Sequence, residues 1–245
     1  MSIRRRARTR GVPPSGNGAS SFHLGWRLPV DAGHLVEAAV TLEVTHAPVV
    51  EHLYFWALQV GFPGAGGAHL GLQWNRAFPG YGAANWGGYA VDGSLLPGTE
   101  SPLRSTPGDP NTRDYPWQPE RACRLRVHSV YDGVWRGEVA DVAAGEATTV
   151  RDLIAASPYL AEPTVWSEVF ARCDDPSVTV RWSDFEVVTE RGERITPTAL
   201  VVNYQAHADG GCAKTTSALD DQGRALQITN TERTAPQGTA LPLPN

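Results

Sequence analysis

The sequence predicts an all-β protein: a two-sheet antiparallel β-sandwich of jelly-roll type with one long loop rich in glycine and proline. Short segments in which apolar and polar residues alternate recur along the chain, as expected of strands with one buried face. Glycine and proline account for 25 and 19 of the 245 residues, which favours many turns over long helices. No repeat of fixed period occurs, which argues against a propeller.

The first strands are expected between residues 35 and 75. Leu35–Thr45 alternates regularly between apolar and polar residues. His52–Phe62 is apolar on both faces, which is typical of a central strand covered on both sides. Pro63–Gly67 is rich in glycine and reverses the chain, so Ala68–Asn75 is expected to pair with the preceding strand as a hairpin.

A second group of strands follows residue 122. Cys123–Tyr131 and Val134–Asp141 flank Asp132-Gly133, whose residue types are a hairpin signature. Thr148–Ala156 is the best helix candidate, about two turns long. Further strands are expected at Thr164–Arg172, at Ser177–Val188 with a bulge near Asp184, at Ala199–Gln205 and at Ala225–Thr229.

The chain is expected to form a single β-sandwich domain at residues 22–235, between a disordered Arg-rich tail at 1–21 and a C-terminal tail at 236–245. Five of the first ten residues are arginine, whereas acidic residues exceed basic ones by ten in the rest of the chain. A body with that charge repels a phosphate backbone, so nucleic acid is not an expected partner. The oligomeric state stays open.

The expected localisation rests on the N-terminal sequence and on the cysteines. No window approaches 18 consecutive apolar residues, so no membrane-spanning helix is expected. No apolar segment follows the arginines, so the chain as written is expected in the cytoplasm, with export by another route as the alternative. In a reducing compartment Cys123, Cys173 and Cys212 are expected to be buried thiols. In an exported chain Cys173 and Cys212 are the expected disulfide, because each lies near a chain reversal.

Residues 76–120 form the most site-like stretch of the sequence. Aromatic and amide side chains stand there on a framework of glycine and proline, and long loops within compact domains are usually functional. Aromatic rings stack on sugar rings while amides bond the hydroxyl groups. The predicted ligand-binding residues are Trp74, Asn75, Asn85, Trp86, Tyr89, Tyr115 and Trp117. We expect Trp74, Asn85, Trp86, Tyr115 and Trp117 to gather around one depression; the alternative is that the rings only pin the loop onto the sandwich.

Two carboxylates, Glu168 and Asp114, are the candidate catalytic groups. Glu168 shares a strand face with Trp166 and Phe170, and a carboxyl group among aromatic rings has the raised pKa that a general acid needs. One of these two acids is expected to be the carboxylate nearest the depression. The alternative for Glu168 is an ion pair with an arginine such as Arg172.

Two short acidic turns are the candidate metal site. Asp209-Gly210-Gly211 and Asp220–Gly223 are of the kind that holds Ca²⁺ with carboxylate and backbone oxygens. The candidate ligands are therefore Asp209, Asp220 and Asp221, with calcium as the one cofactor considered and none required. The alternative is that both segments are plain turns. The histidines show no zinc-binding spacing.

Four segments together resemble a known family: Tyr54–Phe62, Gly67–Gln73, Val165–Phe170 and Asp209–Thr216. An aromatic strand ending in Gly-Phe, followed by a Gly-Leu-Gln strand, is similar to an uncharacterised bacterial family of jelly-roll domains, and more distantly to the concanavalin A-like lectins and glucanases. The resemblance implies a sandwich fold. A glucanase would need a Glu-x-Asp-x-x-Glu strand, and Glu138–Asp141 lacks both the spacing and the second glutamate.

Three functions remain open from the sequence. The first is a lectin-like protein that binds a carbohydrate or another small molecule at an aromatic-lined site. The second is an enzyme on the same scaffold, a glycan hydrolase or lyase or a small-molecule cyclase, that uses Glu168 or Asp114. The third is a structural or interaction protein whose aromatic residues are simply core.

Overall fold

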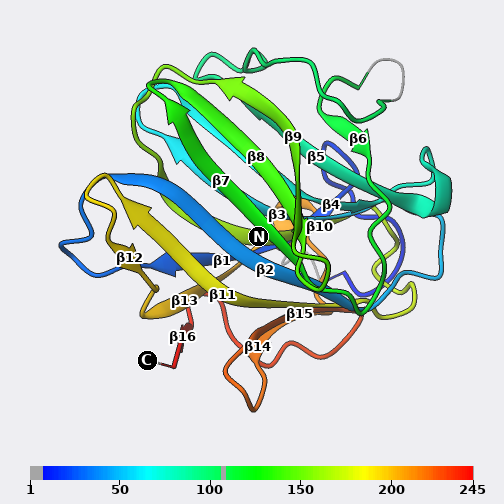
Figure 1. Ribbon diagram of the computed structural model, residues 1–245. Helices are drawn as coiled ribbons and strands as arrows, with labels where there is room; N and C mark the ends of the chain where they lie inside the picture. Colours follow the sequence, from blue (N-terminus) through cyan, green and yellow to red (C-terminus); the bar gives the residue numbers. More distant parts are fainter. Residues whose placement is uncertain (1–7, 106–108, 245) are drawn as a thin grey trace.

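The computed structural model describes residues 8–105 and 109–244, in which two antiparallel sheets pack face to face (Figure 1). Sheet I has the order β16-β13-β1-β10-β3-β4-β5-β6, and sheet II has the order β14-β15-β11-β2-β7-β8-β9, with β12 paired to β11. The predicted two-sheet β-sandwich is confirmed.

The strands are short, and most are joined by tight turns. Those of sheet I are β1 (Ser20–Arg27), β3 (Tyr54–Phe62), β4 (Gly66–Trp74), β5 (Gly82–Tyr89), β6 (Thr112–Asp114), β10 (Ala161–Val169), β13 (Ala199–Tyr204) and β16 (Ala240–Pro242). Those of sheet II are β2 (Leu35–His46), β7 (Cys123–Tyr131), β8 (Val134–Asp141), β9 (Glu146–Ile154), β11 (Thr179–Thr189), β12 (Arg194–Ile195), β14 (Thr215–Leu219) and β15 (Ala225–Thr229). Two 3-10 turns are η1 (Pro79–Tyr81) and η2 (His207–Asp209).

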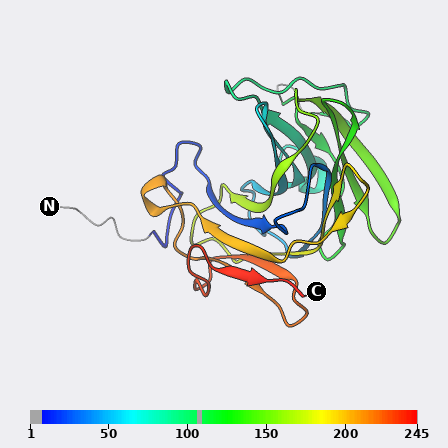
Figure 2. The same cartoon turned by 90° about the vertical axis from the view of Figure 1, so that its left-hand side faces the viewer.

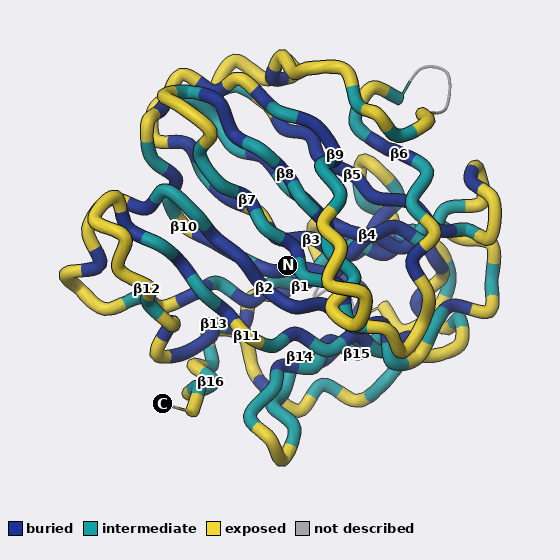
Figure 3. Tube along the Cα trace, in the orientation of Figure 1, coloured by how far each residue is buried: buried dark blue, intermediate teal, exposed yellow. Residues whose placement is uncertain are grey.

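Four tryptophans fill the interior between the sheets. Trp56 and Trp86 come from sheet I, Trp135 and Trp182 come from sheet II, and all four are fully buried. Figure 3 shows the buried residues concentrated along the middles of the strands and the exposed ones at the turns. The alternation predicted from the sequence therefore places one face of each sheet in a shared core.

The segment 76–120 is not a single loop, and that prediction is wrong. Its first part forms β5, which pairs with β4 along its whole length and with β6 on its other side. The glycines of β5 allow close backbone approach: a Cβ on Gly88 would lie 2.2 Å from the Gly67 carbonyl oxygen. The glycines here allow neighbouring strands to pack closely. Because glycine is also common in turns, the same residues predicted a loop.

The predicted helix at Thr148–Ala156 is also wrong, because these residues lie mainly in β9, which pairs with β8. The register shifts between Gly137 and Glu138, so the alternation along β9 is interrupted by a bulge. Val150 and Leu153 are both buried at a spacing of three, which imitates a helical pattern in the sequence.

Other local predictions are confirmed. Strands β7 and β8 form a hairpin across Asp132-Gly133. The ladder between β11 and β2 shifts between Ser183 and Glu186, where Asp184 has a positive φ of 51°. Trp56 and Trp166 are buried, as expected.

The chain before β1 lies against the sandwich from residue 8 onward. Cys173 and Cys212 form a disulfide, and Cys123 is a buried free thiol whose pKa is raised to about 11 by burial. Arg8 pairs with Cys212 through a parallel β-bridge, and the Cys173 amide donates to the Gly11 carbonyl. Figure 2 shows this N-terminal segment beside the loop that precedes β14. Residues 8–21 are therefore placed on the domain, with Ser20 and Ser21 in β1. Residues 1–7 and Asn245 of the predicted tails lie outside the described residues.

The C-terminal segment also reaches the sheet. Residues 240–242 form β16, which adds to the edge of sheet I by pairing with β13. Within the described ranges, no helix has both the length and the apolar character needed to cross a bilayer.

Candidate functional site

The outer face of sheet I carries aromatic, imidazole and amide side chains in register. Alternate residues of a strand point to the same side, so cross-strand partners line up in rows that face away from sheet II. One row consists of Asn203, His23, Trp166, Ala57, Gly71 and Asn85. The next row consists of Ser21, Glu168, Phe55, Gln73, Ala83 and Asp114.

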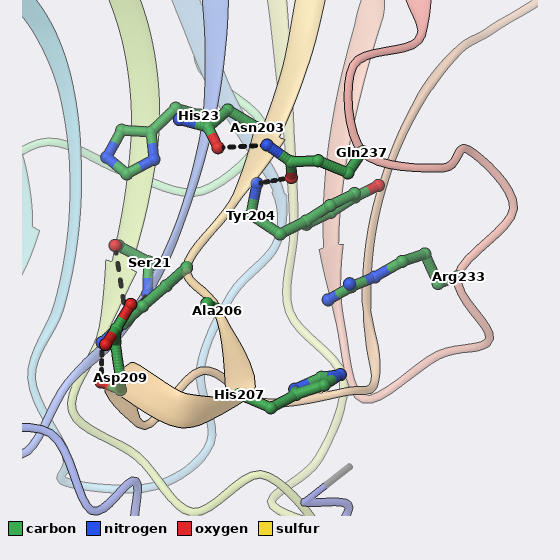
Figure 4. Close-up of a pocket in the computed structure, with 10 residues that line it drawn as sticks. Ser21, His23, Asn203, Tyr204, Ala206, His207, Asp209, Arg233 and Gln237 are labelled. Atoms are coloured by element: carbon green, nitrogen blue, oxygen red, sulfur yellow. Dashed lines mark hydrogen bonds between the residues drawn. The ribbon is translucent and has the colours of Figure 1, made fainter. Parts of the chain in front are cut away.

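A hollow of about 680 Å³ opens at the β1–β13 end of this face, and we call it the β13 hollow (Figure 4). Its floor comes from β1 and β13, one wall from the segment around η2, and the other from the chain that leads to β16. The lining residues are Ser21, His23, Asn203, Tyr204, Gln205, Ala206, His207, Asp209, Arg233 and Gln237.

The amide groups of the hollow hold one another in place. The Gln237 side chain donates to Asn203 Oδ1 at 2.6 Å and accepts from the Tyr204 backbone amide at 2.7 Å. Gln205 Oε1 accepts from the Ser21 amide at 2.8 Å. These contacts fix the orientation of several donors and acceptors before any ligand arrives, which lowers the ordering cost of binding.

Trp166 is the centre of an aromatic cluster beside the hollow. Its ring lies 4.9 Å from Phe55, 5.7 Å from His69 and 6.2 Å from His23, measured between centroids. Burial lowers the pKa of both histidines to about 4, so both imidazoles are neutral at pH 7. Within the described part of the chain, His23 Nδ1 is buried without a hydrogen-bond partner.

Glu168 lies on this face next to Ser21, as its predicted strand face implied. Burial raises the pKa of its carboxyl group, and a hydrogen bond from Asn17 Nδ2 at 2.9 Å opposes that shift. The ion pair considered as its alternative is not among the salt bridges of the described residues. Glu168 is therefore a desolvated carboxyl group held by an amide.

Arg233 forms the cationic side of the hollow. Its guanidinium carbon lies 3.6 Å from the centroid of the Tyr204 ring. Its Nε donates to the Thr215 carbonyl at 3.0 Å, and one terminal nitrogen donates to the Cys212 carbonyl at 3.1 Å. Burial lowers the pKa of Arg233, but from a value so high that the group stays charged.

The aromatic residues predicted to bind ligand lie elsewhere. Trp86 is in the core, where a Cβ on Gly137 would lie 2.6 Å from its ring. Trp117 is buried and donates its Nε1 to the Gln73 carbonyl. Trp74 stacks on Tyr81 at 4.6 Å and donates to the Val50 carbonyl. These rings hold β4, β5 and the following segments together, which was the alternative considered for them.

The other predicted ligand residues are also separate from the hollow. Asn75 donates to Gln73 Oε1, and Asn85 is buried with its amide donating to Thr112 Oγ1. Tyr115 packs against the core, and burial raises its pKa to about 12. Tyr89 is exposed at the end of β5. None of them lines the β13 hollow.

The two candidate catalytic acids share a row but are far apart. Four strand spacings separate Glu168 on β10 from Asp114 on β6, which amounts to about 19 Å. Glycosidases place their two carboxyl groups about 5–9.5 Å apart. The structure does not bring these two acids together as a pair.

The predicted metal ligands do not converge. Asp220 accepts from the backbone amides of Gln222 and Arg224 and from the Arg224 guanidinium, so its oxygens close a turn. Asp209 lies in η2 and lines the hollow. In residues 8–105 and 109–244, no group of three or more His, Cys, Asp or Glu side chains is arranged to hold a metal ion.

The sequence did not reveal the lining residues of the hollow, except for Asp209, which was considered as a metal ligand. They come from four segments, around residues 21–23, 203–209, 233 and 237, that meet only when β13 pairs with β1. Alternation of Ser21, His23 and Gly25 with buried residues was a usable signal for β1. Nothing in the sequence indicated that Arg233 would reach it.

The chain matches no protein-family model and no curated protein sequence. Among solved structures it is similar to scytalido-glutamic peptidase bound to a peptide-based transition-state analogue, with 11% identity over 86% of this chain and 98% of that chain and a TM-score of 0.47. The eqolisin peptidase SCP-B has 10% identity over 86% of this chain and 98% of its own, with a TM-score of 0.46. Peanut lectin has 10% identity over 76% and 79%, with a TM-score of 0.33. These values describe a loosely shared all-β architecture and say nothing of the site.

Proposed function

We propose that the β13 hollow and the adjoining Trp166 cluster bind a carbohydrate, in the manner of a lectin. The observation that carries this proposal is the polar lining of the hollow, in which neutral amide and hydroxyl groups are already oriented by mutual hydrogen bonds. Sugar hydroxyl groups both donate and accept, so they match such a lining.

The outer face of sheet II is a poor alternative place for a ligand. Its charged side chains pair with one another: Arg126 with Glu37 and Glu138, and Arg181 with Glu43. Groups saturated in this way have little capacity left for a ligand. The site therefore belongs to sheet I.

The disulfide bears on the compartment in which the protein works. Disulfides persist in oxidising compartments, so Cys173–Cys212 supports export, which the sequence left open, over the cytoplasm. The ligand proposed here is then a glycan met outside the cytoplasm.

A glycan array followed by calorimetry on the best ligand tests this proposal. Asn203→Ala should weaken binding by about 1–3 kcal/mol, because it leaves a ligand group and Gln237 without a partner. Asn203 is exposed, so folding should be unaffected. Gln118→Ala, which removes an exposed amide outside the hollow, is the matched control. Absence of binding to any glycan would reject the proposal.

A hydrolase that uses Glu168 is the second candidate. Glu168 and Gln73 lie in one row on either side of Phe55. Asn75 donates a hydrogen bond to Gln73 Oε1, so the amide nitrogen of Gln73 is left to act as a donor. A carboxyl group with raised pKa can transfer a proton, and an amide donor can polarise the bond to be cleaved.

Glu168→Gln separates this candidate from simple binding. Turnover of labelled polysaccharides and peptides should fall at least about 100-fold, the usual contribution of a general acid or base. Affinity for the uncleaved ligand should be nearly unchanged. Equal rates for the variant and the original chain would remove Glu168 from any catalytic role.

A further inference from the structure

Arg233 carries a positive charge for which the described residues supply no anionic partner. It takes part in none of the ion pairs among residues 8–105 and 109–244. The groups that accept its hydrogen bonds are the carbonyls of Cys212 and Thr215 and the Thr215 hydroxyl, all uncharged. A partly buried charge without a counter-charge leaves a local positive potential.

The side chain is also held rigidly at the hollow. Tyr204 stacks against one face of the guanidinium, and the bonds to Cys212 and Thr215 occupy Nε and one terminal nitrogen. The other terminal nitrogen makes no hydrogen bond to any described residue. Cys212 is itself fixed by the disulfide, so little rotamer entropy is lost when a ligand binds that free nitrogen.

Two further basic residues lie near Cys212, along the chain or by backbone pairing. Lys214, the only lysine, is two residues from Cys212, and the backbone of Arg8 pairs with Cys212 and accepts from the Ala213 amide. Asp209 is the one acid in the lining of the hollow. Arg233 is therefore the guanidinium group of the hollow that can bind an anion.

We infer that the ligand of the β13 hollow is an acidic saccharide, whose carboxylate or sulfate group binds the free edge of Arg233. The inference rests on the proposed function and adds the charge of the ligand to it. A charge-assisted bond to Arg233 gives specificity for acidic over neutral sugars.

Calorimetry with three matched probes tests the inference: oligogalacturonate for a carboxylate, a sulfated galactan oligosaccharide for a sulfate ester, and a neutral galactan oligosaccharide. One of the two acidic probes should bind at least about tenfold more tightly than the neutral one at low salt. Raising the salt concentration should reduce that preference.

Arg233→Gln should remove the preference by weakening the acidic probe about 10–100-fold while leaving the neutral probe unchanged. Arg224→Gln is the matched control, because Arg224 pairs with Asp220 in the β14–β15 turn and does not line the hollow. Because Arg233 also donates hydrogen bonds to Thr215, its replacement can disturb the fold, so Arg233→Lys is made in parallel. It keeps the charge but not the planar fork, and it should retain part of the preference.

The possible outcomes distinguish a failure of the acidic-ligand inference from a failure of the proposed glycan binding. Equal affinity of the original chain for acidic and neutral probes, or an equal loss of both in Arg233→Gln, overturns the acidic-ligand inference and leaves glycan binding standing. No binding of any probe, or of any glycan on the array, overturns the proposed function itself. If Arg233→Gln does not fold, the salt dependence of the original chain and the affinities of Arg233→Lys decide the question.

Discussion

The outer faces of the two sheets carry different kinds of side chain. Sheet II covers its solvent side with arginines and acids that pair across strands, such as Arg136 with Asp152 at 2.8 Å. Sheet I carries neutral histidines, amides and aromatic rings on its solvent side, and among the described residues Asn17 is the hydrogen-bond partner of the Glu168 carboxyl group. Within the described strands of sheet I, no ion pair joins two side chains.

The difference indicates which face is available for a ligand. Paired charges on sheet II satisfy one another and keep a solvated surface soluble. Beside sheet I, one terminal nitrogen of Arg233 is left without a partner among the described residues, at a hollow large enough for sugar rings. Unused bonding capacity beside a cavity is the mark of a recognition surface.

The largest effect is expected for the interior that both faces share. Trp86→Ala should lower the free energy of unfolding by about 3–5 kcal/mol, because it empties the space between β5 and Gly137. Urea denaturation followed by circular dichroism measures the change. Tyr89→Ala, three residues along and exposed, should change it by less than about 0.5 kcal/mol. A stable Trp86→Ala variant that loses ligand affinity would instead restore Trp86 as a binding residue.

Acid should destabilise the protein through the sheet I face. The folded-state pKa of His23 and His69 is lowered from 6.5 to about 4, so the stability they contribute is present above pH 6.5 and is lost as the pH falls towards 4. The loss is at most on the order of 3 kcal/mol for each histidine. The neighbouring Glu168 has a raised pKa and works in the opposite sense, losing stability as the pH rises.

Unfolding measured between pH 7 and pH 4 checks this prediction against a His23→Gln, His69→Gln double variant. The variant should show a clearly flatter pH dependence than the original chain. An unchanged profile would mean that the decline does not come from these two histidines.

The ion pairs of sheet II should have a small effect and none on binding. A double-mutant cycle on Arg136 and Asp152 should give a coupling of about 0.2–1 kcal/mol, the range for pairs near the surface. Affinity for the sheet I ligand should not change in any corner of the cycle. A loss of affinity would show that the ligand reaches the sheet II face as well.

The smallest effect is expected for calcium. Asp220 already accepts from two backbone amides and from Arg224, so its carboxylate is occupied within the turn. Addition of calcium or of a chelator should shift the Tm by less than about 1 °C, since binding of a metal to the folded state alone would raise it by mass action. A larger rise with calcium, abolished by Asp220→Asn, would establish the metal site considered from the sequence.

The candidate site was predictable only in part. Alternation within one strand was enough to place Trp166 and Glu168 on the same face. Either Glu168 or Asp114 was expected as the carboxylate nearest one depression, and the register separates these two acids by four strand spacings. Trp86 was assigned to a surface because the glycines of β5 were read as a loop.

The sequence by itself determined the two-sheet architecture, most strand positions and the turn at Asp132-Gly133, because periodicity and turn chemistry act over a few neighbouring residues. Tertiary structure alone decided that β13 pairs with β1, and this pairing places Asn203 beside His23 and lets Arg233 and Gln237 close the hollow. Strand order depends on contacts between residues far apart along the chain. Local sequence patterns do not specify which of the distant strands pair with each other.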